Sequence, residues 1–592
     1  MKIGAFYQNN TNYNISNKSI PNYLTFGLKM VSPIKVDTVS FTSNNKPLSP
    51  QEKMQNYAIE LLEELNLQKG QRLHITAESK YLPFVDILSA EAYKMGSGLV
   101  FYNIIEPELE ELKSKYSITE DFDYKRKEIN DLKKNNALFI TIDDSNNPFL
   151  ASRLTDEEIE AEQLKLTGGI PEEIYNEFKI DPREIFKDAL DIHRGQPVFI
   201  QAEREHLPFI KRLVEYLYSE NDTRKVDIEI NNNNKKNMLK YGDESICTEF
   251  TDAFAEARKE RYENDIAALY LFSPDPNEYE GIDPERISKN SRARMEKIQK
   301  YYNLNASHVP WLMYYVPTIK SIKDAYPEYD NPIEMISMAY KDANKINRIG
   351  SIKTHLDLLD ERAYKMNQLM RSGYRTLHYV SVDENGNPDG KTNFRITMSP
   401  KSKFNPSRHI MPKYGHNVIT NIPTEEVFTA PQADTAEGVI SATMPLSLNG
   451  NTIHGIRFTF KDGKITKIHA DTNEDILREH IHTNINADRL GEVAIVAGSP
   501  IAEIGRLFYS TLQDENAACH LAIGRAYPDS IEGTEEIDDY SEVQKYLDNL
   551  KINQSPVHTD FMVGGKGVTI FAENSETGDV VTVVKNDEFL CV

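Results

Sequence analysis

The α/β character of this chain rests on a stretch that occurs twice, Lys69-Gly-Gln-Arg-Leu-His-Ile-Thr-Ala-Glu-Ser-Lys-Tyr-Leu-Pro-Phe84 and Arg194-Gly-Gln-Pro-Val-Phe-Ile-Gln-Ala-Glu-Arg-Glu-His-Leu-Pro-Phe209. Gly-Gln, Ala-Glu and Leu-Pro-Phe recur in register at a constant offset of 125 positions. Each copy runs from a turn through a short apolar strand into a helix, and such alternation favours a parallel sheet. Two copies are too few for a solenoid, so the pattern predicts a duplicated α/β domain over roughly residues 50–150 and 180–275.

The composition is that of a globular protein with a strong negative charge. Hydrophobic residues make up 39% and charged residues 27% of the 592 positions, and the formal net charge is −23. Nucleic acids and anionic membranes need a basic protein face, so neither is expected as a partner. The three scattered cysteines form no metal-finger spacing and no disulfide framework, which fits a reducing cytoplasm. We see no signal peptide and no membrane span, and we expect a cytoplasmic protein.

Four carboxylates and two imidazoles towards the C-terminus stand in apolar or turn-like surroundings. Any one of them alone would most often be a solvated or structural side chain. The context changes that balance, because Glu492 leads directly into Val-Ala-Ile-Val496 and Glu426 precedes Val-Phe-Thr-Ala-Pro431. An unpaired carboxylate at a buried strand end is costly, whereas a coordinated one is not. The six residues are Glu426, Glu492, Glu515, His520, His558 and Asp560.

The spacing of these residues distinguishes between kinds of metal site. His558 and Asp560 are two positions apart, so on a strand both side chains point to one face. Glu515 and His520 are five positions apart, about 140° around a regular helix, so they must straddle a helix end or a bend. No His-Glu-x-x-His motif occurs, which argues against a single-zinc protease. Two divalent ions would balance four carboxylates, and the donor set suits zinc, cobalt or manganese without choosing among them.

Four motifs carry a resemblance to a known family: Asn421-Ile-Pro-Thr-Glu-Glu-Val-Phe-Thr-Ala-Pro431, Leu490-Gly-Glu-Val-Ala-Ile-Val496, Phe508-Tyr-Ser-Thr-Leu-Gln-Asp-Glu-Asn-Ala-Ala-Cys-His-Leu-Ala-Ile-Gly-Arg-Ala-Tyr527 and His558-Thr-Asp-Phe-Met-Val-Gly564. Over roughly residues 177–592 the chain resembles the thermophilic-aminopeptidase family of dinuclear metallopeptidases, which includes aminopeptidases T and S. The resemblance implies removal of single N-terminal residues from peptides with a free N-terminus, by a water activated between two metal ions. It also implies a homodimer with an enclosed cavity.

The resemblance further implies roles for individual residues. Tyr527 matches the family's active-site tyrosine, which can hydrogen-bond the oxyanion or a metal-bound group. Glu425 is the predicted general base, on its adjacency to Glu426 and on analogy with other dinuclear peptidases. The interpretation of Glu425 as a plain acid beside a ligand has equal weight. The implied metal ligands, with Glu492 as the bridge, are Glu426, Glu492, Glu515, His520, His558 and Asp560.

We predict three parts in an α/β and α+β chain. Residues 1–176 would be an additional N-terminal α/β module, the internal duplicate, which ordinary family members lack. Residues 177–372 would be the N-terminal α/β domain of the aminopeptidase. Its segment from residue 282 onward is expected to be mostly helical, with breaks at Pro310 and Pro317. Residues 373–592 would form the mixed-sheet catalytic domain that binds the two metals.

Two other functions stay open at this stage. An enzyme with the same metal chemistry could hydrolyse another amide or an ester, and it would then show no preference for a free α-amine. A binding or assembly protein could keep the metal site for stability alone, and it would bind metal without turning over peptide.

Overall fold

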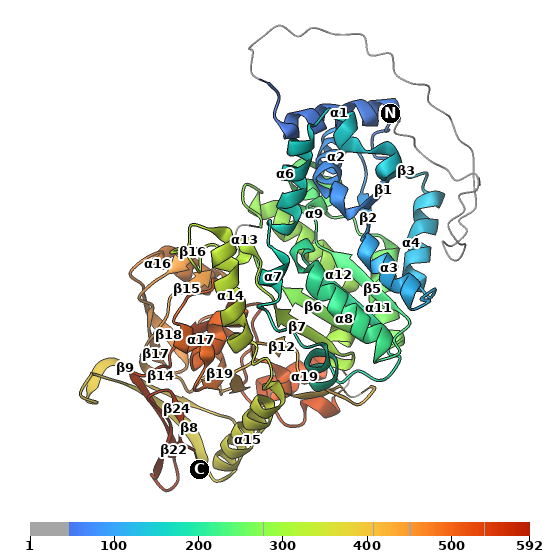
Figure 1. Cartoon of the computed structure of the whole chain (residues 1–592). Coiled ribbons are helices and arrows are strands. Elements are labelled where there is room, and N and C mark those ends of the chain that lie inside the picture. The colour runs from blue at the N-terminus through green and yellow to red at the C-terminus, as the bar shows by residue number, and fades with distance from the viewer. Residues whose placement is uncertain are drawn as a thin grey trace.

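The computed structural model describes residues 47–275, 278–406, 408–411, 413–448, 451–537 and 539–591. Residues 1–46, which belong to the predicted N-terminal module, lie outside the described residues. The fold is mixed α/β, with parallel sheets in the N-terminal half and antiparallel sheets in the C-terminal half (Figure 1). Within the described part of the chain, no helix is long and apolar enough to cross a membrane.

The first α/β unit contains a three-stranded parallel sheet in the order β2-β1-β3. Its strands are β1 (Leu73–Glu78), β2 (Val100–Ile105) and β3 (Leu138–Ile142). Its helices are α1 (Pro50–Glu64), α2 (Leu82–Lys94), α3 (Pro107–Lys115) and α4 (Asp123–Lys134). Three more helices, α5 (Pro148–Ala151), α6 (Asp156–Thr167) and α7 (Glu172–Tyr175), lead to the second unit.

The second α/β unit contains a five-stranded parallel sheet in the order β12-β7-β6-β4-β5. Its strands are β4 (Val198–Ala202), β5 (Val226–Ile230), β6 (Ala267–Phe272), β7 (Trp311–Tyr315) and β12 (Asn421–Ile422). The helices between β4 and β7 are α8 (Leu207–Ser219), α9 (Asn234–Tyr241), α10 (Glu244–Cys247), α11 (Asp252–Glu263) and α12 (Pro284–His308).

The two copies of the repeated stretch adopt the same local structure. Gly70 and Gly195 have φ angles of 74° and 79°, a region that glycine enters without a steric penalty. Each copy then forms a strand, a short 3-10 turn and a helix that carries Pro83 or Pro208 in its first turn, where the missing amide costs nothing. The strand orders β2-β1-β3 and β5-β4-β6 correspond as well.

The two units are joined by shared apolar cores. Met238 and Leu239 of α9 pack into the core built on the first sheet. In the opposite direction, Phe122, which precedes α4, packs against Phe199 and Ala268 of the second sheet. Burial of apolar surface in both directions therefore holds the units together.

The prediction that residues 282–372 are mostly helical misses one strand. Helices α12, α13 (Ile319–Ile322), α14 (Pro332–Ile346) and α15 (Ile352–Arg371) lie in this segment. Between the two prolines, however, Trp311–Tyr315 forms β7, which pairs in parallel with β6. A five-residue apolar run fits a buried strand or a buried helix segment equally well, and only its place in the sheet decides.

Two larger antiparallel sheets form the C-terminal half. One has the order β18-β17-β14-β9-β8-β22-β23-β24, and the other has the order β13-β19-β20-β21. The strands of the first are β8 (Tyr374–Val382), β9 (Pro388–Thr397), β14 (Glu437–Ser441), β17 (Arg457–Lys461), β18 (Lys464–His469), β22 (Val568–Asn574), β23 (Val580–Lys585) and β24 (Glu588–Phe589). The strands of the second are β13 (Glu426–Thr429), β19 (Leu490–Val496), β20 (His520–Gly524) and β21 (His558–Met562).

Smaller elements complete this half of the protein. Two hairpins are formed by β10 (His409–Met411) with β11 (His416–Val418), and by β15 (Leu446–Leu448) with β16 (Asn451–Ile453). The helices are α16 (Glu474–Thr483), α17 (Pro500–Ile504), α18 (Thr511–Asp514) and α19 (Tyr540–Asn549). Between Ile422 of β12 and Glu426 of β13 the chain leaves the five-stranded parallel sheet and enters the four-stranded antiparallel sheet, beside the predicted ligands.

Candidate metal centre

Strand alternation brings most of the predicted ligands to one face of the four-stranded sheet. Val493 and Leu521 point to the opposite face, where they belong to the apolar core. Glu492 of β19 lies opposite Ala522 of β20, and Ala522 in turn lies opposite Asp560 of β21. Residues directly opposite each other share a face, so the two carboxylates point the same way with only a methyl group between them.

The same register adds both imidazoles. His520 lies opposite Ala494, two residues after Glu492, and His558 lies opposite Gly524. Residues two apart on a strand share a face, so both rings point towards the carboxylates. The small side chains opposite them leave room for the functional groups. This confirms the expectation that His558 and Asp560 share a face.

A local irregularity in β19 sets the direction of the Glu492 side chain. We expected this residue at the end of a buried strand, but it is the third residue of β19. The pairing register with β20 shifts between Leu490 and Glu492. A β-bulge of this kind re-aims a side chain. Gly491 lies within it, and a Cβ atom there would come within 2.4 Å of the Gly524 carbonyl oxygen. Glycine is therefore required at this close approach.

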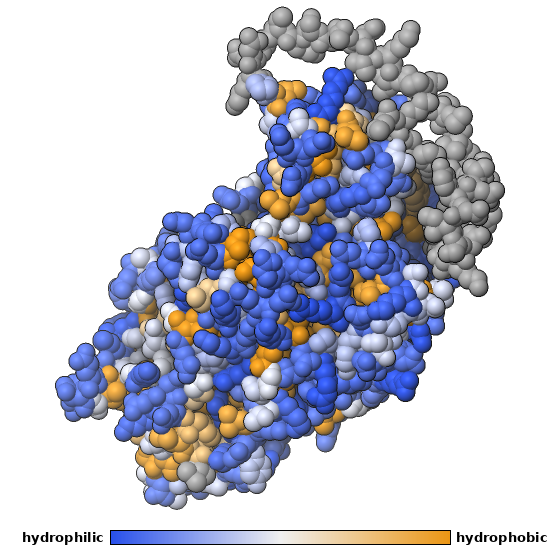
Figure 2. All heavy atoms as spheres, in the orientation of Figure 1, coloured by the Kyte–Doolittle hydropathy of each residue, from blue (hydrophilic) through white to orange (hydrophobic). Residues whose placement is uncertain are grey.

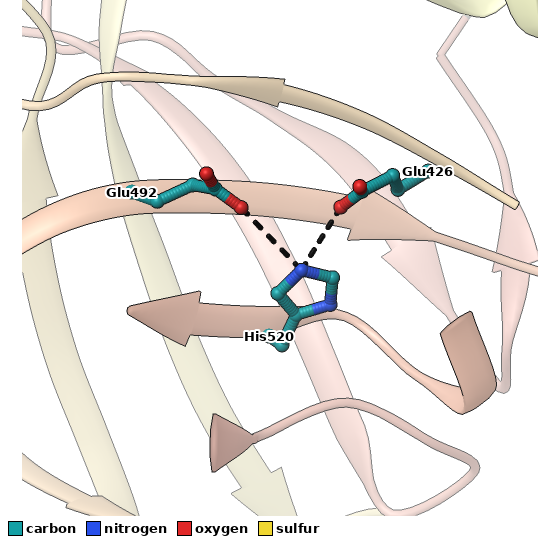
Figure 3. A group of neighbouring side chains, drawn as sticks. All are labelled: Glu426, Glu492 and His520. Carbon is teal, nitrogen blue, oxygen red and sulfur yellow. Dashed lines mark ion pairs between the residues drawn. The ribbon is translucent and has the colours of Figure 1, made fainter. Parts of the chain in front are cut away.

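The side chains form two groups that share Glu492. In the first, Nε2 of His520 lies 2.9 Å from Oε2 of Glu426 and 3.5 Å from Oε1 of Glu492 (Figure 3). In the second, Nε2 of His558 lies 3.2 Å from Oδ1 of Asp560 and 3.7 Å from Oε2 of Glu492. Within each group the potential ligand atoms lie within 4.8 Å of one another. The two oxygens of Glu492 thus face different imidazoles, as a bridging carboxylate requires.

Hydrogen bonds to the other ring nitrogens orient both imidazoles. Nδ1 of His520 lies 3.1 Å from the Ala518 carbonyl oxygen, and Nδ1 of His558 lies 2.6 Å from the Arg525 carbonyl oxygen. A carbonyl oxygen only accepts, so Nδ1 carries the proton in both rings. In the neutral imidazole this leaves the Nε2 lone pair directed at the carboxylates, as in histidines that ligate metals.

The buried carboxylates of the group carry more negative charge than the neighbouring side chains compensate, as expected of a site for cations. Oε2 of Glu426 and Oδ1 of Asp560 are buried, and apart from the imidazole rings beside them neither has a hydrogen-bond partner. Burial raises the pKa of Glu492, and burial together with the neighbouring Asp560 raises the pKa of Glu515. Burial alone would lower the pKa of His520, but Glu426 raises it well above its usual range. Buried carboxylates at this density need compensating cations, and divalent metal ions fit oxygen and imidazole donors.

Glu515 reaches the group from a different element. It begins a short 3-10 turn, Glu515–Ala517, and His520 begins β20 just after it. The expectation that these two residues straddle a helix end is therefore confirmed. Glu515 lines a cavity together with His558 and Asp560, although it belongs to neither of the two groups described above.

Tyr527 lies at the solvent side of the group. Its ring centroid is 4.8 Å from that of His558 and 5.9 Å from that of Phe428. The residue is 37% exposed, and burial of the remainder raises the pKa of its hydroxyl. The tyrosine is therefore a neutral hydrogen-bond donor at the rim of the cluster.

Glu425 belongs to a separate network on the other side of the chain. Its two carboxylate oxygens accept hydrogen bonds of 2.8 and 2.7 Å from Nε and Nη2 of Arg348. The Arg362 guanidinium donates to the Glu425 carbonyl at 3.0 Å, and the Glu425 amide donates to Oδ1 of Asn516 at 2.6 Å. His355 donates to the neighbouring Thr424 carbonyl at 2.7 Å. Among the described residues, neither ligand group includes Glu425.

The residues that surround Glu425 were not predicted from the sequence. Arg362 and His355 lie on the buried face of α15, seven residues apart. A histidine and an arginine on the apolar stripe of an amphipathic helix are the signal that could have indicated a buried polar contact. The partner could not have been predicted, because Arg348 and Glu425 are 77 positions apart.

Fold and site together define a class of protein, in which a carboxylate and imidazole cluster on one sheet face is suited to divalent metal. The chain belongs to the thermophilic metalloprotease (M29) family, whose model matches residues 50–168 and 183–589. This confirms the family resemblance, and it extends it to residues 50–168, which the resemblance had left out.

Individual relatives agree with the family. The chain is 30% identical to aminopeptidase AmpS of Bacillus subtilis over 388 residues, which cover 64% of this chain and 91% of that protein. It is 32% identical to aminopeptidase PepS of Streptococcus thermophilus over 336 residues, covering 55% of this chain and 77% of that protein. The solved structure of AmpT from Thermus thermophilus matches with a TM-score of 0.62 and 25% identity, covering 70% of this chain and 99% of that one.

Proposed function

We infer that this member of the metalloprotease family is a metal-dependent aminopeptidase that removes single residues from peptides with a free N-terminus. The observation that carries the inference is the shared carboxylate of Glu492, whose oxygens face His520 and His558 separately. The similarity to proteins named as aminopeptidases in two bacteria supports the reaction.

We propose that six residues hold two divalent ions, with Glu492 between them. Glu426 and His520 would complete one site, and His558 and Asp560 the other. Glu515 would supply a further carboxylate from its helical turn. Zinc, cobalt and manganese all suit this donor set.

The chain's own residues would prepare the reaction. When bound, paired divalent ions polarise a peptide carbonyl and lower the pKa of a water molecule. The carbonyl oxygens of Ala518 and Arg525 hold the two imidazole rings in place. The neutral hydroxyl of Tyr527 would donate a hydrogen bond to the oxyanion that develops as the carbonyl is attacked.

Glu425 as the general base stays a prediction, and the contacts of its carboxylate speak against it. Both oxygens are engaged by Arg348, and the side chain is buried. A base must reach the proton that it abstracts. These contacts instead support a role in holding the start of β13, which positions Glu426.

We propose that the first α/β unit is a duplicate of the second, within a chain divided at about residues 176 and 372. The matching glycines, turns and strand orders described above support a common origin. We also propose a homodimer. Apolar side chains gather on the surface at the end of the molecule that carries β22 and β24 (Figure 2). Val580, the first residue of β23, and Leu590, just after β24, are 55% and 42% exposed. Apolar surface patches of this kind are typical of contacts between subunits.

The proposed reaction is tested by hydrolysis of aminoacyl-7-amido-4-methylcoumarins. Metal-stripped protein would be assayed alone and after addition of zinc, cobalt or manganese, with N-acetylated substrates and a Glu492→Gln variant as controls. We expect turnover that needs metal and a free amine and that disappears in the variant. Equal turnover of acetylated substrates would favour another amide or ester hydrolase. Metal binding without any turnover would favour a structural metal site.

A further inference from the structure

A small cavity opens beside the proposed metal ligands. Its volume is about 130 Å³. Its lining includes Glu515, His558 and Asp560 together with the apolar residues Leu446, Leu448 and Met562. Thr511 and Asp514 also line it, and the Asp514 carboxylate accepts hydrogen bonds from the Phe508 and Ser510 amides. The cavity thus joins the polar cluster to an apolar wall.

The apolar wall comes from two elements that are fixed to each other. Met562 is the last residue of β21 and lies two positions after Asp560, so its side chain shares the face of the cluster. Leu446 and Leu448 share one face of β15, which is paired with β16. The Thr443 amide donates to the Met562 carbonyl at 2.8 Å and ties the start of the hairpin to β21. The wall is therefore formed before any ligand arrives.

The volume sets the size of the group that the cavity can hold. Sites that enclose a whole small molecule measure roughly 300–1,000 Å³, so this cavity takes only part of a ligand. A leucine-lined cavity of about 150 Å³ accommodates a benzene-sized group. Here the ligand's amino and carbonyl groups would occupy the polar end, so less than the full volume remains for a side chain. An aliphatic side chain fits that remainder, and an indole or a guanidinium group does not.

We propose that this cavity binds the first side chain of the peptide substrate and selects aliphatic residues of leucine or methionine size. The proposal rests on the aminopeptidase function inferred above. A free amino group held at the cluster puts the first Cα within one or two bonds of the cavity. Contact with the apolar wall favours a side chain of methyl and methylene groups over a charged one, which would lose its hydration there. Leu446, Leu448 and Met562 are thereby specificity-determining residues.

The test compares kcat/KM for leucyl, methionyl, alanyl, phenylalanyl and arginyl coumarin amides. We expect the wild-type protein to favour leucyl over alanyl and arginyl substrates by about tenfold or more, since one methylene in an apolar pocket is worth roughly 10–200-fold. Leu448→Ala and Met562→Ala each enlarge the cavity and should raise the ratio of phenylalanyl to leucyl turnover by about tenfold. Leu477→Ala, a truncation of a leucine of α16 in the same apolar core, should leave that ratio unchanged.

The outcomes separate this proposal from the proposed function. Turnover of free-amine substrates without a preference for leucyl, or with ratios unaffected by both cavity variants, would overturn the specificity proposal and leave the aminopeptidase standing. A wild-type protein that cleaves none of the substrates would overturn both. Because the two variants lie on different strands, one that fails to fold still leaves the other as a test. Thermal unfolding of each variant identifies such a failure.

Discussion

Glu425 and Glu426 are neighbours in the sequence, yet their carboxylates lie on opposite sides of the chain and differ in the positive charge that surrounds them. On the Glu425 side the protein supplies its own positive charge, from Arg348. On the Glu426 side the nearest partner is His520, and three more carboxylates stand close by. The first side is a closed structural network, whereas the second is short of positive charge. The difference shows that a site for added cations can be recognised by buried carboxylates whose charge the surrounding protein side chains do not neutralise.

Replacing Glu426 should have the largest effect on activity. Glu426→Gln removes a proposed ligand charge, and we expect kcat/KM to fall by about 10³-fold or more, as when a preorganised charge-stabilising group is lost. Bound metal, measured by mass spectrometry of the intact protein, should drop from two ions per chain towards one. Full activity with two ions bound would show that the two sides do not differ in the way we propose.

Replacing Glu425 should instead lower the free energy of unfolding. Glu425→Gln leaves Arg348 without its counter-charge, and breaking a buried pair costs roughly 3–5 kcal/mol of unfolding free energy. Because Arg348 is 29% exposed, we expect the lower end, about 3 kcal/mol, in urea unfolding. At a temperature where the variant is folded, kcat should stay within about threefold of the wild type. A loss of about 10²-fold or more in the folded variant would instead support Glu425 as the general base.

Removing metal should destabilise the protein, and more so at higher pH. Burial alone would lower the pKa of His558, but Asp560 and Glu492 raise it from 6.5 to about 10 in the metal-free fold. The stability that this proton contributes is fully present below pH 6.5 and is lost as the pH rises towards 10. The raised pKa values of Glu492 and Glu515 act in the same direction, and the lowered pKa of Asp560 acts only in acid.

The measurement is the unfolding midpoint with chelator and with zinc, at about pH 6.5 and about pH 9. Zinc at a hundred times its dissociation constant should add about 2.7 kcal/mol per site, because it binds only the folded state. We expect the difference between the zinc and chelator midpoints to grow with pH. A difference that is the same at both pH values would contradict the charge deficit on the Glu426 side.

The smallest effect is expected at the exposed rim of the cluster. Tyr527→Phe removes one neutral hydrogen bond at a partly exposed site, worth about 1 kcal/mol. That corresponds to a fall in kcat of about fivefold, with KM and metal content unchanged. A fall of 10³-fold would assign Tyr527 to the central machinery, whereas no change would remove it from the reaction.

Much of the candidate site could be predicted because local sequence carried it. The acids stood beside apolar runs, and the two-residue spacing of His558 and Asp560 fixed their common face as soon as the segment formed a strand. Likewise, the Gly-Gln turns and Leu-Pro-Phe helix starts predicted two similar units. Strand β7 was not predicted, because five apolar residues between two prolines show neither the helical nor the strand periodicity of hydrophobic residues.

The sequence by itself determined which side chains could take part and which local elements would present them, since strand alternation and turn chemistry act over a few residues. The tertiary structure alone decided that Glu425 turns to Arg348 while Glu426 turns to His520. It also decided that a bulge aims Glu492 between two imidazoles, and that Leu448 and Met562 close one cavity. These outcomes depend on register and on contacts between residues dozens of positions apart. Local propensity does not encode them, because they arise only when the sheets pack and each buried charge must find a partner.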